Sequence, residues 1–454
     1  MNEGIATSIF DLFEIGLGPS SSHTIAPMKA GHDFLKEAAS LSAEVKNRAE
    51  DIEISLYGSL SATGKGHGTD RAVLAGLMGK HPHTCRSDFL DGLLADVHTR
   101  HRIDLGGRKV VLTGKSIVWE ATGHDFPFNN TLIIRLRGQK DVLFEKEYYS
   151  VGGGFLQWKG WSPTARGLPV YPYKTADELK KIMDSQNLPL HELVMENETA
   201  ITGMSRHHIR EKIVRILRTM EAAVDGGIEQ DGILPGPLGL HRKAPGLFRH
   251  AKYERKISDR FLIYLSAYAF AAAEENAAGH RVVTAPTCGA AGVMASLVYT
   301  MKHHLRLPLD DIVRGFLAAS VVGFLAKNNA SVAGAEVGCQ GEVGVASSMG
   351  AAMLAYARTS RFEIMENAAE TALEHHLGMT CDPVAGYVQI PCIERNAMGA
   401  IKAYTAALIA TAETAGFHMV GLDKAIMAMA ETGRDMNQKY RETSRGGLAL
   451  LVRC

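Results

Sequence analysis

Four of the six cysteines in this chain stand where they could bind a metal. Cys339, Cys381 and Cys392 lie within one apolar stretch rich in small residues, and Cys454 is the last residue of the sequence. A catalytic metal needs fixed ligands and one exchangeable position. Three internal thiols and a fourth on a terminal segment therefore suggest a catalytic metal centre.

The spacing of these cysteines alone favours a different interpretation, in which they are buried structural thiols. No two of them form the close pair typical of zinc sites, and ferredoxin-type iron–sulfur spacing is absent. Two local features support ligation nevertheless. Cys381 precedes Asp-Pro and Cys392 follows Pro391, which predicts turns rather than helix faces for both. Packing also seldom calls for a cysteine at a chain end.

A histidine in the segment GSLSATGKGHGTD, Gly58 to Asp70, is the second candidate for chemistry. The alternating DIEISLYG predicts a strand before this segment, and RAVLAGLMG predicts a helix after it. We expect a glycine-rich loop with neither Walker nor Rossmann spacing, presenting Lys65, His67 and Asp70 together. Because its glycine neighbours supply no packing, His67 is either a proton-transfer group near neutral pH or a surface residue.

Hydroxyl side chains gather before two predicted helices. PSSSHT precedes IAPMKAGHDFLKEA, an amphipathic helix that Ser22 or Thr24 could cap, leaving groups that could hold a carboxylate or phosphate. TAPTCGAAG has the same form around Thr287, and KNNAS places Asn328 near the cysteine stretch. A plain helix cap and an exposed helix junction are the simpler interpretations.

Periodicity divides the chain into two parts. Helical and strand patterns alternate up to about Gly160, which predicts an α/β (α+β) domain over residues 1–160. A glycine run at 152–154 begins an irregular stretch, and residues 161–174 are predicted as a linker. From residue 175 to 454 apolar residues recur at three-to-four spacing, so we expect an all-helical domain ending in a C-terminal tail.

Composition excludes several classes of protein. The 49 basic and 49 acidic residues balance, which offers no general attraction to nucleic acid or an anionic membrane. No secretory signal is recognised at the N-terminus, and the longest apolar runs are too short to span a bilayer. We therefore expect a cytoplasmic protein, whose cysteines are free, metal-bound or catalytic rather than paired in disulfides.

Several motifs, in order, carry a resemblance to a known family: PSSSHT, TGKGHGTD, APTCGAAG, KNNASVAGAEVGCQGEVG, GMTCDPVAGYVQIPCIERN and the terminal cysteine. Together they resemble the bacterial iron–sulfur L-serine dehydratases (L-serine deaminases) of single-chain form. The resemblance extends from about Phe10 to Cys454. It implies an N-terminal domain similar to a regulatory serine-binding domain, and a mostly α-helical catalytic domain with a [4Fe–4S] cluster that converts L-serine to pyruvate and ammonia.

The resemblance also implies roles for single residues. Cys339, Cys381 and Cys392 would hold three irons, and Cys454 would bind the fourth until substrate displaces it. His67 would be the general base, assisted by Lys65 and His23. The substrate-binding residues would be Ser20, Ser21, Ser22, Thr24, Thr287 and Asn328.

Two other functions stay open at this point. The chain could be a related iron–sulfur hydro-lyase acting on another small hydroxy acid or amino acid. It could also be a non-catalytic amino-acid sensor with structural cysteines. Neither alternative explains the terminal cysteine together with the histidine segment. A homodimer is expected from the family and from the general preference for twofold symmetry.

Overall fold

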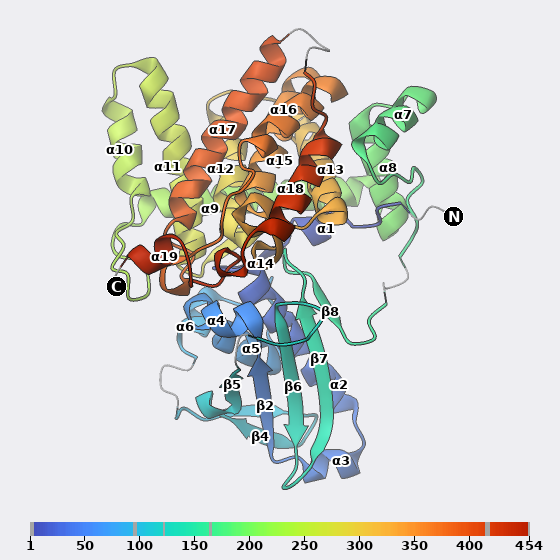
Figure 1. Ribbon diagram of the computed structural model, residues 1–454, viewed down its shortest axis with the longest axis vertical. Coiled ribbons are helices and arrows are strands. Elements are labelled where there is room, and N and C mark those ends of the chain that lie inside the picture. Colours follow the sequence, from blue (N-terminus) through green and yellow to red (C-terminus); the bar gives the residue numbers. More distant parts are fainter. Residues whose placement is uncertain (1–3, 94–97, 121–122, 163–165, 414–417, 453–454) are drawn as a thin grey trace.

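A computed structural model gives the fold of the chain and describes residues 4–93, 98–120, 123–162, 166–413 and 418–452. Figure 1 shows two parts, a bundle of helices above and a smaller part built around a β-sheet below. The predicted fold class is confirmed, because the N-terminal part contains the sheet and the C-terminal part is mostly helical.

The lower part contains a mixed sheet and a separate hairpin. Its strands are β2 Asp51–Leu56, β3 His101–Asp104, β4 Lys109–Leu112, β5 Ile117–Trp119, β6 Thr131–Arg137, β7 Val142–Ser150 and β8 Leu156–Trp158. Five strands form the sheet in the order β5-β2-β6-β7-β8, with β2 and β5 parallel and the other neighbours antiparallel. β3 and β4 form the hairpin.

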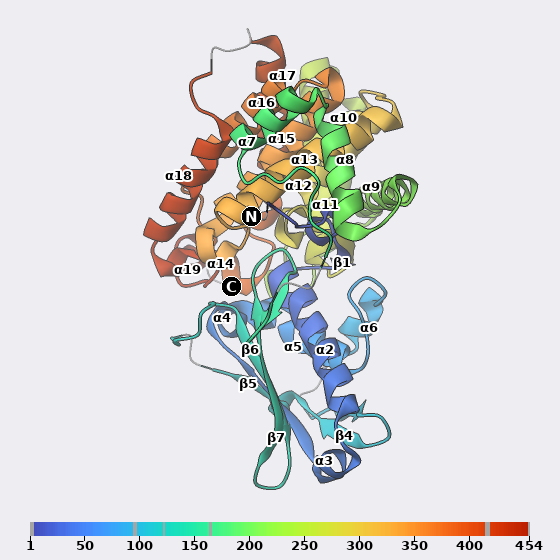
Figure 2. The same ribbon diagram turned by 90° about the vertical axis from the view of Figure 1, so that its right-hand side faces the viewer.

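Helices cover one side of this sheet (Figure 2). The strand predicted around Ile52, Ile54 and Leu56 is confirmed as β2, and all three side chains are buried. The predicted amphipathic helix is confirmed as α2 (Ala26–Ser40), which packs beside α5 (Thr69–Leu77). The remaining helices here are α3 Ala43–Arg48, α4 Gly58–His67 and α6 Ser87–Asp91.

The predicted glycine-rich loop before His67 is wrong, because these residues form helix α4. Gly68, which has a left-handed backbone at φ 64°, ends α4 and separates it from α5. The helical glycine Gly66 has a packing reason: a Cβ there would lie 2.5 Å from the carbonyl oxygen of Gly386. The glycines therefore allow α4 to approach the upper part closely instead of breaking the helix.

The upper part is a helical bundle. Its helices are α7 Ala176–Gln186, α8 Leu190–Thr202, α9 Arg206–Glu229, α10 Ala244–Tyr253, α11 Ile257–Ala277, α12 Ala291–His303, α13 Leu309–Asn329, α14 Gly334–Val337, α15 Val343–Thr359, α16 Phe362–Glu374, α17 Cys392–Ala412, α18 Leu422–Asp435 and α19 Leu448–Leu451. Small residues bring helices close, since a Cβ at Gly315 would lie 2.4 Å from the carbonyl oxygen of Met353. No helix among the described residues has the length and apolarity needed to cross a membrane.

The start of the chain packs in the upper part. Helix α1 (Ile9–Leu12) lies in the bundle core, and strand β1 (Ile15–Leu17) pairs antiparallel with β9 (Arg281–Val283). The expectation of an all-helical region after residue 175 is therefore wrong at β9. A three-residue strand is too short to show a period-two pattern. The division at residues 160 and 175 stays a prediction.

The glycine run at 152–154 does not act as a free linker. It forms the turn between β7 and β8, where the Phe155 amide donates to the Gly152 carbonyl. All three glycines have positive φ. A Cβ at Gly152 would lie 2.8 Å from the Cβ of Ala333, so this turn touches the helical part directly.

Candidate active site

Three predicted ligands, Cys339, Cys381 and Cys392, line one cavity at the junction of the two parts. Cys339 lies in the short 3-10 helix η4 (Gly338–Gly341), and Cys381 lies in the loop after α16. The prediction of a turn is wrong for Cys392, because it is the first residue of α17. Its side chain nevertheless stands at a helix end, where it reaches the cavity.

Long-range backbone bonds hold the Cys381 loop. The Cys381 amide donates to the Tyr440 carbonyl at 2.7 Å, and the Glu442 amide donates to the Cys381 carbonyl at 2.7 Å. The C-terminal segment is also bound to Asp382, whose carboxylate accepts from the Leu448 amide at 2.7 Å. Cys454 lies outside the described residues, so its predicted role stays a prediction.

Burial dominates the electrostatics of the three thiols. Burial raises the pKa of Cys339, Cys381 and Cys392, and the Glu342 carboxylate raises all three further. The guanidinium of Arg395 opposes this shift at Cys339 and Cys392. Unligated thiols would therefore stay neutral here. Three soft donors beside a fixed guanidinium form a set suited to a cationic metal group, which would favour the thiolates.

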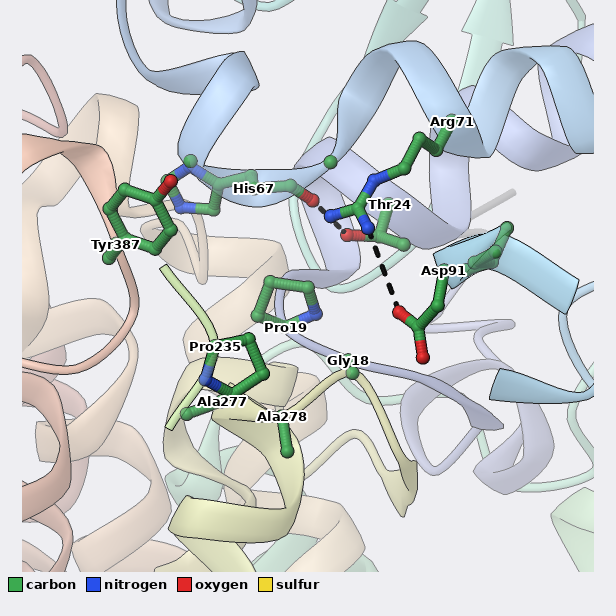
Figure 3. A pocket seen from close by; sticks show the side chains of 14 residues that line it. Gly18, Pro19, Thr24, His67, Arg71, Asp91, Pro235, Ala277, Ala278 and Tyr387 are labelled. Atoms are coloured by element: carbon green, nitrogen blue, oxygen red, sulfur yellow. Dashed lines mark hydrogen bonds and ion pairs between the residues drawn. The ribbon is translucent and has the colours of Figure 1, made fainter. Parts of the chain in front are cut away.

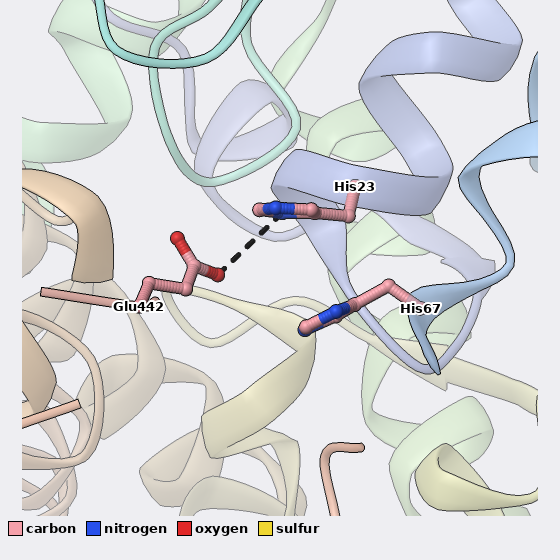
Figure 4. Close-up of side chains that lie close together, drawn as sticks. All are labelled: His23, His67 and Glu442. Atoms are coloured by element: carbon pink, nitrogen blue, oxygen red, sulfur yellow. Dashed lines mark ion pairs between the residues drawn. The ribbon is translucent and has the colours of Figure 1, made fainter. Parts of the chain in front are cut away.

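Two stacked histidines of the lower part lie at this site, and one of them lines the cavity. His23 lies in the one-turn π-helix η1 (Ser21–Ile25), and His67 is the last residue of α4. Their rings stack with centroids 4.4 Å apart. Figure 4 shows the two rings lying one over the other, with the Glu442 carboxylate directed at His23. Only His67 of the two histidines lines the cysteine cavity itself.

Hydrogen bonding determines which nitrogen of His67 is basic. Its Nδ1 lies 2.8 Å from the Thr63 carbonyl, which can only accept, so Nδ1 carries the hydrogen and Nε2 is free to accept a proton. Burial, together with His23, lowers the pKa of His67 to about 3. Burial also lowers the pKa of His23 to about 4. Both rings are therefore neutral at physiological pH.

The hydroxyl segment mainly supports the histidines. Ser22 Oγ lies 2.8 Å from His23 Nδ1, and Ser20 Oγ accepts from the His23 amide at 3.3 Å. Thr24 Oγ1 donates to the His67 carbonyl at 2.9 Å. The prediction that Ser22 or Thr24 caps α2 is wrong, because the N-cap of α2 is Ile25 and has no side-chain cap bond; Ser20 caps the preceding turn η1. Ser20 lines the cysteine cavity, whereas Ser21 is buried in η1.

The other predicted site residues are dispersed. Lys65 is exposed on α4, with its ammonium 5.5 Å from the centre of the Trp119 ring. Asn328 is exposed near the end of α13 and donates to the side chain of Asn329. Thr287 is buried, and its hydroxyl has no hydrogen-bond partner among the described residues. The structure therefore brings Thr287 into the buried site region but leaves Lys65 and Asn328 at the surface.

Sequence reasoning missed four charged residues that line the cavity, namely Glu342, Asp382, Arg395 and Glu442. Burial raises the pKa of Glu342, and the nearby Glu442 carboxylate raises it further. Glu342 and Arg395 stand inside the motifs GCQGEVG and IPCIERN, where a charged residue in an apolar run requires a partner if it is buried. No comparable signal marks Glu442, which has a left-handed backbone at φ 58°.

Glu442 and the two histidines are also close enough to bind a single cation. One donor atom from each lies within 4.8 Å of the others. However, Ser22 contacts His23 Nδ1, and the hydroxyls of Ser59 and Thr63 each lie 3.1 Å from His23 Nε2. A metal would have to displace these bonds. The hydrogen-bonded arrangement instead suits groups that hold and move protons.

A second cavity reaches His67 from the other side (Figure 3). His67 and Pro19 line both cavities, so they form the partition between them. Tyr387 lies beside His67 in this outer cavity, and Arg71 and Asp91 form an ion pair across it at 3.7 Å. This cavity is therefore a candidate route for small molecules to the histidine.

Two family models together match most of the chain. The model of the serine dehydratase beta chain matches residues 8–161, and the model of the serine dehydratase alpha chain matches residues 185–449. The first match contains both histidines, and the second contains Cys339, Cys381 and Cys392.

Full-length bacterial relatives give the same result. L-serine dehydratase 1 of Escherichia coli (strain K12) is 43% identical over 456 residues, covering 98% of this chain and 99% of the relative. The L-serine dehydratase of Streptomyces coelicolor is 43% identical, covering 99% and 100%. That of Haemophilus influenzae is 42% identical, covering 98% and 99%. The similarity therefore extends through both parts and the junction between them.

Proposed function

This chain belongs to the bacterial L-serine dehydratase family, and we propose on that basis that it converts L-serine to pyruvate and ammonia. One observation carries the assignment of the site. His67 and three cysteines, which come from different parts of the fold, line the same cavity. A base and a metal-binding set on facing walls are what the elimination of water from a hydroxy amino acid requires.

We propose that Cys339, Cys381 and Cys392 hold a [4Fe–4S] cluster and that Cys454 is its exchangeable fourth ligand. The residues present fit this group. Two buried thiols and the half-buried Cys392 share one cavity with the Arg395 guanidinium, which would stabilise an anionic thiolate set. The buried Thr287 hydroxyl and Glu442 Oε2 have no hydrogen-bond partner among the described residues, so polar atoms remain available for a bound group.

When bound, the cluster supplies a Lewis-acidic iron that makes the serine hydroxyl a better leaving group. Nε2 of His67 takes the Cα proton, since its Nδ1 is held by Thr63. Burial keeps His67 neutral at neutral pH, so its Nε2 has a free lone pair to take the proton. Loss of water leaves an enamine, which tautomerises to an imine and is hydrolysed to pyruvate and ammonia.

His23 has a supporting role in this scheme. It stacks on His67 and is fixed by Ser22, Ser59 and Thr63. Such a ring fixes the position of the base. Ser20, which lines the cavity, is the member of the hydroxyl segment placed to bind a polar group of the substrate.

The cavity walls restrict water. Pro19, Pro383, Val388 and Pro391 surround the polar groups with apolar surface. Exclusion of water strengthens each electrostatic interaction within the site and protects the enamine until the product leaves. We further propose that the enzyme is a cytoplasmic homodimer, which light scattering on the purified protein and cell fractionation would test.

The first experiment is anaerobic purification, followed by iron and sulfide assays and by measurement of pyruvate released from L-serine. We expect about four irons per chain, as one [4Fe–4S] cluster requires. Pyruvate formation should be lost when the cluster is destroyed by air. Folded protein that contains no iron would refute the cluster, and iron-loaded protein that releases no pyruvate from L-serine would refute the activity.

A further inference from the structure

A third cavity, of about 550 Å³, lies between the two parts of the molecule away from the cysteines. The lower part contributes Lys29 of α2, the loop after α5 and the start of β8. The upper part contributes α1 and one face of α9. Its volume is in the range of small-molecule sites, and interfaces between domains are common places for such sites.

The two carboxylates in this cavity are already neutralised. Glu14 forms an ion pair with Lys29 at 2.5 Å, and Lys29 also donates to the Gly154 carbonyl. Asp11 is paired with Arg166, which lies outside the cavity wall. Neither carboxylate is therefore available to balance a further cation.

Two cations of α9 have no such partner. Lys212 and Arg215 line the cavity, and neither forms an ion pair within the described part of the chain. The Lys212 ammonium instead lies 3.8 Å from the centre of the Phe10 ring. Burial lowers the pKa of Lys212, the Glu198 and Asp11 carboxylates raise it, and Arg215 lowers it by a smaller amount. The positive charge here is only partly compensated.

Two histidines add donors to the same wall. The rings of His81 and His83 have centroids 4.2 Å apart, and both line the cavity. Nδ1 of His81 is buried without a hydrogen-bond partner among the described residues. Burial lowers the pKa of His81 to about 4, with smaller contributions from His83, His32 and Lys29. A bound anion would give His81 Nδ1 a hydrogen-bond partner. It would also reduce the repulsion among the positively charged groups that line the cavity.

The remaining wall is apolar. Phe10, Phe13, Phe155 and Ile216 line the cavity beside the cations. A third lysine, Lys327, lies with its ammonium 4.3 Å from the centre of the Phe155 ring. Inorganic phosphate would leave this apolar wall unused, whereas an anion with a carbon skeleton would cover it.

We propose that this cavity binds a small organic dianion, whose charged end meets Lys212, Arg215 and the histidines and whose carbon body packs on the phenylalanines. Two unpaired cations on one helix and a facing histidine pair match a phosphate monoester or a dicarboxylate. The site is separate from the cysteine cavity, because no residue lines both.

Calorimetric titration of the purified holoenzyme with phenyl phosphate and with succinate, at constant ionic strength, tests the proposal. We expect saturable binding of at least one dianion with a Kd below about 1 mM. Binding of phenyl phosphate alone would indicate a phosphate monoester, and binding of succinate alone would indicate a dicarboxylate. Inorganic phosphate should bind more weakly than phenyl phosphate, because it cannot cover the apolar wall.

The double variant Lys212→Gln with Arg215→Gln should weaken binding at least about tenfold, since each lost charge-assisted bond is of that order. Arg218→Gln is the matched control. It removes one charge from an exposed position on the same helix, outside the cavity, and should leave binding unchanged. Absence of saturable binding by both dianions, or equal binding by the double variant, would overturn the proposal.

Discussion

The two sides of the catalytic cavity are built in different ways. On the histidine side, His67 is bound by Thr63 one turn earlier, and His23 is bound by Ser22 and by the Ser59 and Thr63 hydroxyls of α4. On the cysteine side, the Cys381 loop is held by Tyr440 and Glu442, about sixty residues later. The histidine side is therefore held mainly by contacts within the lower part, whereas the cysteine side depends on contacts with the C-terminal segment.

This difference has a consequence for stability and function. The hydroxyl groups that hold the two histidines all belong to the lower part, which has its own hydrophobic core. The cysteine loop is joined to the C-terminal segment by backbone hydrogen bonds, so its geometry depends on that segment and, in our proposal, on the cluster. We expect substitutions on the cysteine side to remove the cofactor and those on the histidine side to remove chemistry while the cofactor remains.

The largest effect is expected from Cys381→Ser. Loss of one of three fixed ligands should deplete the protein of iron and reduce pyruvate formation at least about 10³-fold, because a Lewis-acidic metal supplies several kcal/mol of barrier reduction. Iron per chain and turnover are measured on anaerobically purified protein. Cys85→Ser is the control, since Cys85 is a buried thiol in the core of the lower part. Native iron content in Cys381→Ser would contradict its assignment as a ligand.

His67→Ala should distinguish most clearly between loss of the base and loss of the cofactor. Removal of the base should lower turnover by a factor on the order of 10² or more. Because His67 is not one of the proposed cluster ligands, the iron content and visible spectrum should match those of the native protein. His101→Ala, at a buried histidine on strand β3, is the control for loss of an imidazole from the same part. Near-native turnover in His67→Ala would exclude it as the base.

Acidification should destabilise the histidine side selectively. Burial lowers the pKa of His67 to about 3, below its ordinary value of 6.5, so the unfolded chain binds more protons at pH 5. The stability due to the neutral ring is full above pH 6.5 and is lost as pH falls toward the folded pKa. Between pH 7.5 and 5 this amounts to roughly 2 kcal/mol for a fully buried histidine.

The measurement compares urea unfolding of native protein and His67→Asn at both pH values. Burial raises the pKa of Glu342 and Glu442, so these groups titrate in the opposite sense. We therefore compare the free energy of unfolding of the native protein with that of the variant. The difference, native minus variant, should fall by roughly 2 kcal/mol on acidification. A difference that is constant with pH would show that His67 is not a buried neutral ring.

The histidine side was only partly predicted from the sequence. The glycines from Gly58 to Asp70 predicted a loop, but the segment up to His67 is helix α4. Gly66 lets this helix lie close to the carbonyl of Gly386. Close packing against a distant segment is invisible to local propensity. The strand β2 and helix α2 were predicted correctly, because their apolar periodicity reports burial within one element.

The cysteines were predicted as ligands from sequence motifs, which identify single residues but not the residues that surround them in the fold. Cys339, Cys381 and Cys392 do share a cavity, as their grouping suggested. Glu442 was missed because only folding brings its segment to Cys381. The short strand β9 was missed for the same reason, since it exists through pairing with β1 at the other end of the chain.

Glu442 links the two sides, so Glu442→Gln tests the link. Its amide donates to Cys381, its carbonyl accepts from Ser59, and its carboxylate lies 3.5 Å from His23 Nδ1. Glutamine keeps the backbone bonds and the size but removes the charge. We expect unchanged iron content and a fall in kcat of about tenfold, the size of one hydrogen bond to a charged group. A loss of iron instead would place Glu442 on the cysteine side.

The smallest effect is expected at Lys65, which was predicted to be catalytic. Lys65 is exposed, and its ammonium lies over the Trp119 ring rather than toward the cavity. Substitutions at such surface positions change free energies by about 0.5 kcal/mol or less, so Lys65→Ala should alter kcat/KM for L-serine less than about twofold. Steady-state kinetics beside His67→Ala gives the comparison. A fall in Lys65→Ala approaching that of His67→Ala would mean that α4 turns Lys65 into the site when serine binds.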